Sequence, residues 1–121
     1  MSDLTGKIGW GRKFVNAFRG IVVGMQGQNS FVVHLPVALL VVGLAFYLRL
    51  DQIRACLLLL CIGTVLTAEL FNSSMEKMAK AVSSEFDPHL RDALDISSGA
   101  VLVAAIFASL VGAAILVSAT L

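Results

Sequence analysis

Apolar residues form three long runs, and short polar segments separate them. The runs span residues 31–48, 55–68 and 96–121, and none contains Asp, Glu, Lys or Arg. A helix needs about 20 mostly apolar residues to cross a bilayer. The middle run is too short for this, so its helix must continue through the polar residues that follow. The pattern therefore predicts three membrane-spanning helices, at about 31–48, 55–82 and 93–121.

The segment before the first run predicts an amphipathic helix on the membrane surface, at about residues 7–22. Its apolar side chains recur at i, i+4, i+7, i+8 and i+11, a spacing that gathers them on one helical face. They are Trp10, Phe14, Ala17, Phe18 and Ile21, and Arg12, Asn16 and Arg19 occupy the opposite face. The glycine-rich, polar residues 20–30 predict a turn before the first span.

Two polar segments connect the predicted spans. Residues 49–54 are short and charged, which predicts a tight hairpin, and residues 83–92 predict a longer loop. Pro88 should stop the preceding helix, so the last helix is expected to start near Asp92. Asp92 and Asp95 could then stabilise its N-terminus through the helix dipole. They would also lie at the same membrane face as Glu69 and Glu76. Pro36 is expected in the first turn of its helix.

Composition identifies the class of protein. Of 121 residues, 58% are hydrophobic and only 14% charged, with a mean hydropathy of +0.89. About a quarter of residues are charged in an average soluble protein, so we expect an all-α integral membrane protein with a single domain. Its N-terminal segment holds Lys7, Arg12, Lys13 and Arg19 against Asp3. The positive-inside rule then predicts a cytoplasmic N-terminus.

The candidate chemistry lies at the end of the middle run. Glu69, Asn72, Ser73 and Glu76 are spaced i, i+3, i+4 and i+7, so they share one helical face near a membrane boundary. One interpretation is a helix end reaching the headgroups, with Asn72 and Ser73 bonded to a neighbouring helix. The other is a functional site, in which one carboxylate acts as a base and one holds a metal ion. His34 is similarly open to two interpretations, a helix-packing donor or part of a proton path.

Two motifs resemble a known family. Ala-Glu-Leu-Phe-Asn-Ser-Ser-Met-Glu (68–76) closes the second predicted span, and Arg-Asp-Ala-Leu-Asp-Ile-Ser-Ser-Gly-Ala-Val-Leu (91–102) opens the third. With Phe18-Arg19-Gly20, Phe31 and His34-Leu35, they are similar to the bacterial diacylglycerol kinase and undecaprenol kinase family. The family pattern is Glu-x-x-Asn-Ser/Thr-x-x-Glu, followed by Lys-Asp-x-x-x-Gly/Ala-Ala-Val.

The resemblance implies ATP-dependent phosphorylation of a membrane lipid alcohol, by a homotrimer of the bacterial inner membrane with active sites between subunits. Glu69 would be the general base on the lipid hydroxyl, and Glu76 would hold Mg²⁺. Asn72 and Asp95 would line the nucleotide site. Phosphoryl transfer depends mainly on positioning and charge neutralisation, which suits these roles.

Three positions depart from the family pattern. Gln28 stands where the family has a second metal-binding Glu, Leu94 where it has a Lys, and Lys80 where it has an Asp. Arg91, Lys77 or Lys80 could restore some positive charge at the nucleotide site, and Arg91 lies one helical turn before Leu94. Two other hypotheses therefore stay open: a family member that binds a lipid or a partner without catalysis, and a proton or ion path through Glu69, Glu76 and His34.

Overall fold

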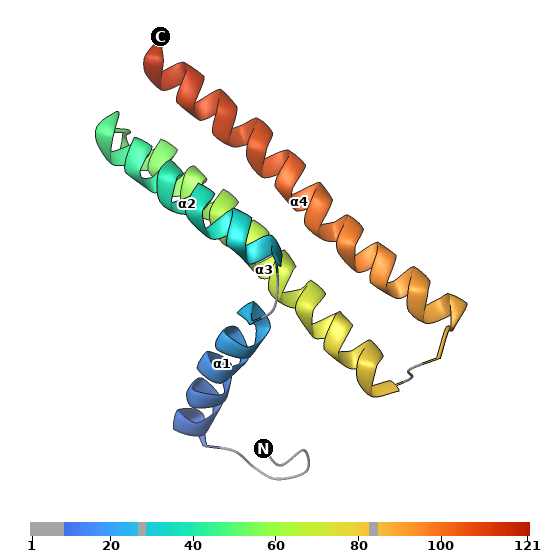
Figure 1. Ribbon diagram of the computed structural model, residues 1–121. Helices are drawn as coiled ribbons and strands as arrows, with labels where there is room; N and C mark the ends of the chain where they lie inside the picture. Colours follow the sequence, from blue (N-terminus) through green and yellow to red (C-terminus); the bar gives the residue numbers. More distant parts are fainter. Residues whose placement is uncertain (1–8, 27–28, 83–84) are drawn as a thin grey trace.

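The computed structural model describes residues 9–26, 29–82 and 85–121, and these form four helices. They are α1 (Trp10–Met25), α2 (Asn29–Tyr47), α3 (Gln52–Val82) and α4 (Pro88–Thr120). Figure 1 shows α2, α3 and α4 side by side, while α1 leaves them at an angle near the middle of α3. The predicted all-helical fold is confirmed for the described residues.

Helix α3 is the element that the other three contact. It runs antiparallel to α4, and a side chain at Gly112 of α4 would meet Leu58 of α3, with a Cβ 3.8 Å from the Leu58 Cδ2 atom. Because α1, α2 and α4 all contact α3, polar side chains of α3 can be covered by more than one neighbouring helix. This places the Glu69 to Glu76 face at the junction of α1, α2 and α3.

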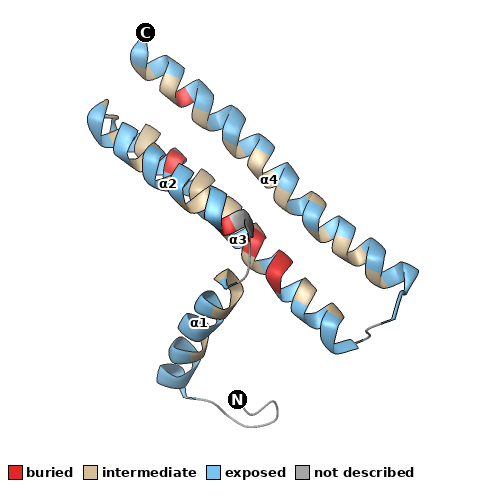
Figure 2. Cartoon of the chain, viewed as in Figure 1, coloured by how far each residue is buried: buried red, intermediate tan, exposed pale blue. Residues whose placement is uncertain are grey.

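Many large apolar residues are exposed, and Figure 2 shows exposed residues along all four helices. Leu60 is 66% exposed, Phe107 64% and Phe46 80%. Such a surface is costly in water, at roughly 25 cal/mol for each Å² of apolar area. This surface is suited to contact with lipid or with further subunits.

Helices α3 and α4 are long and apolar enough to cross a membrane, whereas Phe31–Tyr47 of α2 is a shorter apolar helix. The 31 residues of α3 extend for ~47 Å at 1.5 Å per residue, against ~30 Å for the hydrocarbon core. A helix of this length that crossed the core upright would extend beyond it by about a third of its length. The helix continues through the polar residues 69–76, as predicted.

Several predicted boundaries were wrong. Helix α1 does not end at Val22 but continues to Met25, so Gly20 and Gly24 are helical rather than part of a turn. The glycine spacing predicts a turn, but a glycine inside a helix also lets a neighbouring side chain approach closely. A Cβ at Gly24 would lie only 2.8 Å from Leu70 Cδ2. Pro36 lies inside α2 and not in its first turn.

The start of α4 also differs from the prediction. The helix begins at Pro88, not near Asp92, because proline fits the first helical position, where its missing N–H has no helical partner. Asp87 is the N-cap: its carboxylate accepts hydrogen bonds from the backbone N–H groups of His89 and Leu90, at 2.8 and 3.3 Å. Asp92 and Asp95 consequently lie inside α4, after its first turn, and Asp87 is the residue that caps the helix.

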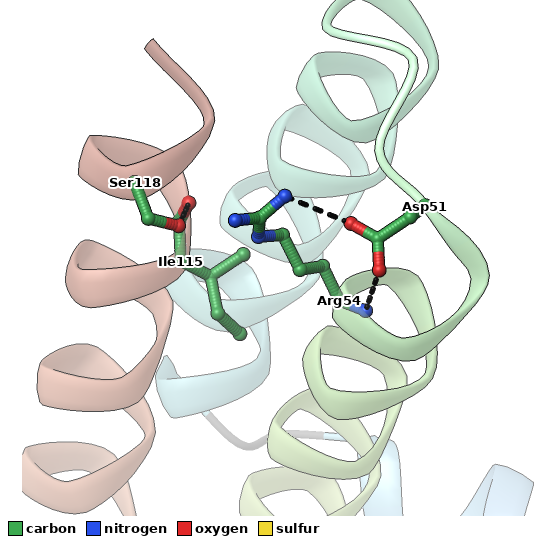
Figure 3. A network of polar contacts seen from close by, with 4 residues as sticks. All are labelled: Asp51, Arg54, Ile115 and Ser118. Atoms are coloured by element: carbon green, nitrogen blue, oxygen red, sulfur yellow. Dashed lines mark hydrogen bonds and ion pairs between the residues drawn. The ribbon is translucent and has the colours of Figure 1, made fainter. Parts of the chain in front are cut away.

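The connection between α2 and α3 is the predicted tight hairpin. Arg49 has φ 52°, in the left-handed region that permits such a turn. Asp51 then accepts hydrogen bonds from Arg54, 3.0 Å from its guanidinium and 3.4 Å from its backbone N–H (Figure 3). Desolvation raises the pKa of Asp51, but these hydrogen bonds outweigh it and hold the pKa below its ordinary value. The bonds tie the first turn of α3 to the hairpin.

Candidate functional site

The polar face of α3 is the most buried polar region that the structure describes. Glu69 is 2% exposed, Ser73 3% and Asn72 9%. Figure 2 shows buried residues in the middle of α3, beside the point where α1 approaches. Glu76, one turn further on, is half-buried. The predicted face is therefore covered by neighbouring helices at one end and more open toward the end of α3.

Helix α2 supplies a partner for the most buried of these carboxylates. The His34 Nδ1 atom forms a hydrogen bond with Glu69 Oε1, as a donor if that nitrogen carries the ring proton. His34 is itself 28% exposed in its side chain. The imidazole thus reaches from a more open surface to a carboxylate that solvent scarcely touches.

Helix α1 is held against the same face. The Ser73 hydroxyl donates a hydrogen bond of 2.8 Å to the backbone carbonyl of Gly24. The close approach of Gly24 to Leu70 lets the two helices meet. Ser73 therefore has the interhelical role that one interpretation of the sequence gave it.

Two buried oxygen atoms of this cluster have no hydrogen-bond partner among the described residues. They are Glu69 Oε2 and Asn72 Oδ1. The Asn72 amide instead donates through Nδ2 to Glu76 Oε1, at 3.1 Å. A buried acceptor without a donor costs roughly 1–3 kcal/mol. Glu69 Oε2 can therefore take up a proton or accept a hydrogen bond from a hydroxyl group. Asn72 Oδ1 can accept a hydrogen bond or contact a cation.

The candidate residues of α4 are arranged differently. Asp95 is exposed, and so is Arg91, whose guanidinium lies 3.9 Å from the Asp92 carboxylate and 5.7 Å from the centre of the Phe86 ring. Leu94 is half-buried and Lys80 is exposed. The structure thus brings Glu69, Asn72 and Glu76 together on α3, while Arg91 and Asp95 present their side chains at the surface of α4.

Of the two candidate metal ligands, Gln28 lies outside the described residues and Glu76 lies within α3. No group of three or more His, Cys, Asp or Glu side chains suitable for a metal ion occurs within residues 9–26, 29–82 and 85–121. Mg²⁺, however, is commonly held by one or two carboxylates together with substrate phosphates and water. Glu76, with the unpartnered Asn72 Oδ1 nearby on its own helix, fits that kind of site.

A groove of about 360 Å³ opens between α2, α3 and α4, beside the polar face. Its walls are almost entirely apolar, with small residues on α4, among them Ala105, Ala108 and Gly112. His34 is also part of its lining. The same imidazole therefore borders the groove and contacts Glu69.

Sequence reasoning did not assign two of these contacts. It considered His34 as a packing donor or as part of a proton or ion path with Glu69 and Glu76, but it did not predict a direct hydrogen bond to Glu69, which is 35 residues away in the sequence. It placed Gly24 in a turn. The signals that could have found them are the only histidine in the first apolar run and a glycine on the apolar side of an amphipathic segment.

Comparison with known proteins supports the family that the two sequence motifs resemble. The family model of prokaryotic diacylglycerol kinase matches residues 15–116. The chain is 29% identical over 101 residues to the undecaprenol kinase of Bacillus subtilis, covering 84% of this chain and 82% of that protein. It is 31% identical over 104 residues to the diacylglycerol kinase of Synechocystis sp., covering 85% of this chain but only 59% of that relative. The chain therefore belongs to the prokaryotic diacylglycerol kinase family, a family of lipid kinases.

Proposed function

We propose that this protein transfers the terminal phosphoryl group of ATP to the hydroxyl group of a membrane lipid, diacylglycerol or undecaprenol, in the bacterial inner membrane. The observation that carries the proposal is the buried Glu69 carboxylate, whose Oε2 atom has no hydrogen-bond partner among the described residues. A carboxylate at membrane depth is expensive and is generally functional. Family membership supports a kinase reaction for it.

In the proposed reaction Glu69 is the general base. Its Oε2 atom takes the proton from the lipid hydroxyl as the hydroxyl oxygen forms a bond to the γ-phosphorus. The bond between that phosphorus and the bridging oxygen breaks, and ADP leaves with the electron pair. Phosphoryl transfer relies mainly on positioning and electrostatic stabilisation, so one oriented base is enough to activate the lipid hydroxyl group.

The nucleotide would bind toward the end of α3 and the start of α4. We assign Asn72, Glu76, Arg91, Asp95 and Gln28 to this site, with Glu76 and Gln28 as the candidates to hold Mg²⁺. When bound, Mg²⁺ would supply positive charge to neutralise the phosphates. Arg91 would supplement that charge, since Leu94 cannot.

The functional assembly is proposed to be a homotrimer with its N-terminus in the cytoplasm. The outward-facing apolar residues of α3 and α4 leave surface for neighbouring subunits as well as for lipid. The exposed Asp95 and Arg91 would then serve the polar face of α3 in an adjacent subunit.

The test is transfer of labelled phosphate from ATP, with Mg²⁺, to diacylglycerol and to undecaprenol supplied separately in detergent. Glu69→Gln should lower kcat by about 10²–10⁴-fold, the range expected for a lost general base, while the protein stays folded. Asp51→Asn, at the other end of α3, is the matched control and should retain activity. Unchanged transfer by Glu69→Gln would overturn the assignment. Native mass spectrometry of the same sample should give three copies, and a monomer would contradict the trimer.

A role in binding without catalysis is the alternative that Gln28 and Leu94 favour, since both remove a charged residue from the family pattern. It predicts that neither lipid is phosphorylated by a folded protein. Nucleotide would still raise the thermal midpoint, because a ligand that binds the native state stabilises it.

A further inference from the structure

We infer that His34 is a positioning residue that orients the Glu69 carboxylate for proton abstraction. The inference rests on the proposed function and extends it to a residue on a different helix. It starts from the His34 Nδ1 to Glu69 Oε1 hydrogen bond between α2 and α3. We assign the imidazole the tautomer with its proton on Nδ1, so that it donates this hydrogen bond to the carboxylate.

Burial makes this donor important. Glu69 is 2% exposed, so water has little access to its oxygen atoms. Oε2 already has no partner among the described residues. Without His34, Oε1 would lose the hydrogen bond that the structure gives it, and the side chain could turn. With His34, one oxygen is held and the other is left to accept a proton.

The location of His34 links the base to an apolar surface. The imidazole borders the groove between α2, α3 and α4, together with Ala38 of its own helix and Leu66 of α3. It is the most polar member of a lining that is otherwise aliphatic apart from Cys61 and Ser109. A hydroxyl group near this end of the groove would therefore meet the oriented carboxylate at the junction of apolar and polar surfaces.

The proposed step balances without a net proton change on His34. The hydroxyl proton moves to Glu69 Oε2, while the Nδ1 proton stays on the imidazole and only its hydrogen bond to Oε1 is used. A base that is itself oriented by a third group is a recurrent arrangement in catalysis. His34 thus acts through Glu69 and does not itself touch the reacting atoms.

The hydrogen bond can be tested without any activity measurement. The chain has two histidines, His34 and His89, so ¹⁵N-histidine labelling of the full chain in bilayers gives two imidazoles, which His89→Asn assigns. His34 should show a protonated Nδ1, because the bond to Glu69 selects that tautomer. Glu69→Leu removes the acceptor and should shift the Nδ1 signal. A His34 signal that is unchanged by Glu69→Leu would overturn the pairing.

The kinetic test compares two substitutions, Asn and Leu, whose side chains have the same number and branching of heavy atoms. Asn places its Nδ2 donor as many bonds from the backbone as His Nδ1, whereas Leu has no donor. His34→Leu should lower kcat by about 10–10²-fold, since a misplaced catalytic group can cost that much, with the KM for ATP within about twofold. His34→Asn should stay within about threefold of wild type, and His89→Asn should be unaffected.

The outcomes separate the inference from the proposed function. Equal losses in His34→Asn and His34→Leu, or a fully active His34→Leu, would overturn the positioning role even if the protein is a kinase. If wild type transfers no phosphate, the kinase proposal fails, and the positioning of a base fails with it. The ¹⁵N shift then still decides whether His34 and Glu69 are paired.

Discussion

At the scale of single residues, the unusual feature is where polarity is buried. Six of the described residues are buried, and Glu69, Asn72 and Ser73 are half of them. Ser73 has a complete hydrogen bond to α1, but Glu69 and Asn72 each keep an unpartnered oxygen. Sites that bind ligands often carry such a local loss of stability. The cluster therefore has the energetic character of a binding site rather than of interhelical packing alone.

This predicts opposite effects of Asn72→Leu on stability and on activity. Leu has nearly the same shape but no buried acceptor to leave unsatisfied, and this gain should exceed the loss of the hydrogen bond to the half-buried Glu76. The free energy of unfolding should therefore rise by about 1 kcal/mol. Phosphate transfer should be lost, because the amide would no longer face the nucleotide or bond to Glu76.

Thermal unfolding in detergent and the labelled-ATP assay measure the two effects. Ser73→Ala is the comparison, since it removes a satisfied hydrogen bond and should lower stability. A fall in stability for Asn72→Leu as large as that for Ser73→Ala would contradict the argument.

At the scale of elements, the docking of α1 depends on one small residue. Gly24 allows α1 to approach α3, and its carbonyl receives the Ser73 hydroxyl. Gly20 lies one turn earlier in the same helix with nothing within 4 Å of the position a Cβ would take. The two glycines have the same intrinsic cost in a helix, so only their surroundings distinguish them.

We therefore expect Gly24→Leu to be less stable than Gly20→Leu by about 1–3 kcal/mol, the usual cost of overpacking a contact. Both substitutions gain the same helix propensity, so the difference reports the contact between α1 and α3. Thermal unfolding of the two purified variants in detergent provides the comparison. Equal thermal midpoints would mean that α1 does not pack against Leu70 and Ser73.

At the scale of the whole molecule, the helices alternate in direction. The end of α3 and the start of α4 lie at one end of the molecule, and the hairpin between α2 and α3 lies with the C-terminus at the other (Figure 1). The positive charges of the N-terminal segment predict that the first end is cytoplasmic. Glu76 and Arg91 would then face the compartment that contains ATP.

Cysteine labelling tests this orientation in a variant whose native Cys56 and Cys61 are replaced by alanine. Phe86→Cys, before α4, should react with a membrane-impermeant maleimide only in inside-out vesicles. Arg49→Cys, in the hairpin, should react only in spheroplasts. Both positions are exposed. The reverse labelling pattern would put the polar face on the wrong side of the membrane for a kinase that uses cytoplasmic ATP.

Sequence patterns predicted the helices well and their boundaries less well. Long uncharged runs identified α3 and α4, because a helix in lipid must satisfy its backbone internally and present apolar side chains. Boundaries depend on single contacts that periodicity does not contain. Asp87 caps α4 through its carboxylate, and Gly24 is a helical residue of α1 at the point where Leu70 of α3 approaches it. Both predictions failed where a local rule competed with a tertiary or capping contact.

The sequence by itself determined that this chain is helical and rich in apolar surface, and that Glu69, Asn72, Ser73 and Glu76 share a face. These properties follow from hydrophobicity and from the 3.6-residue period, which are local. Only the tertiary structure decided which of these side chains are buried, that His34 bonds Glu69, and that Ser73 holds α1. Those contacts join residues 35 and 49 positions apart, and no local pattern specifies which faces of separate helices meet.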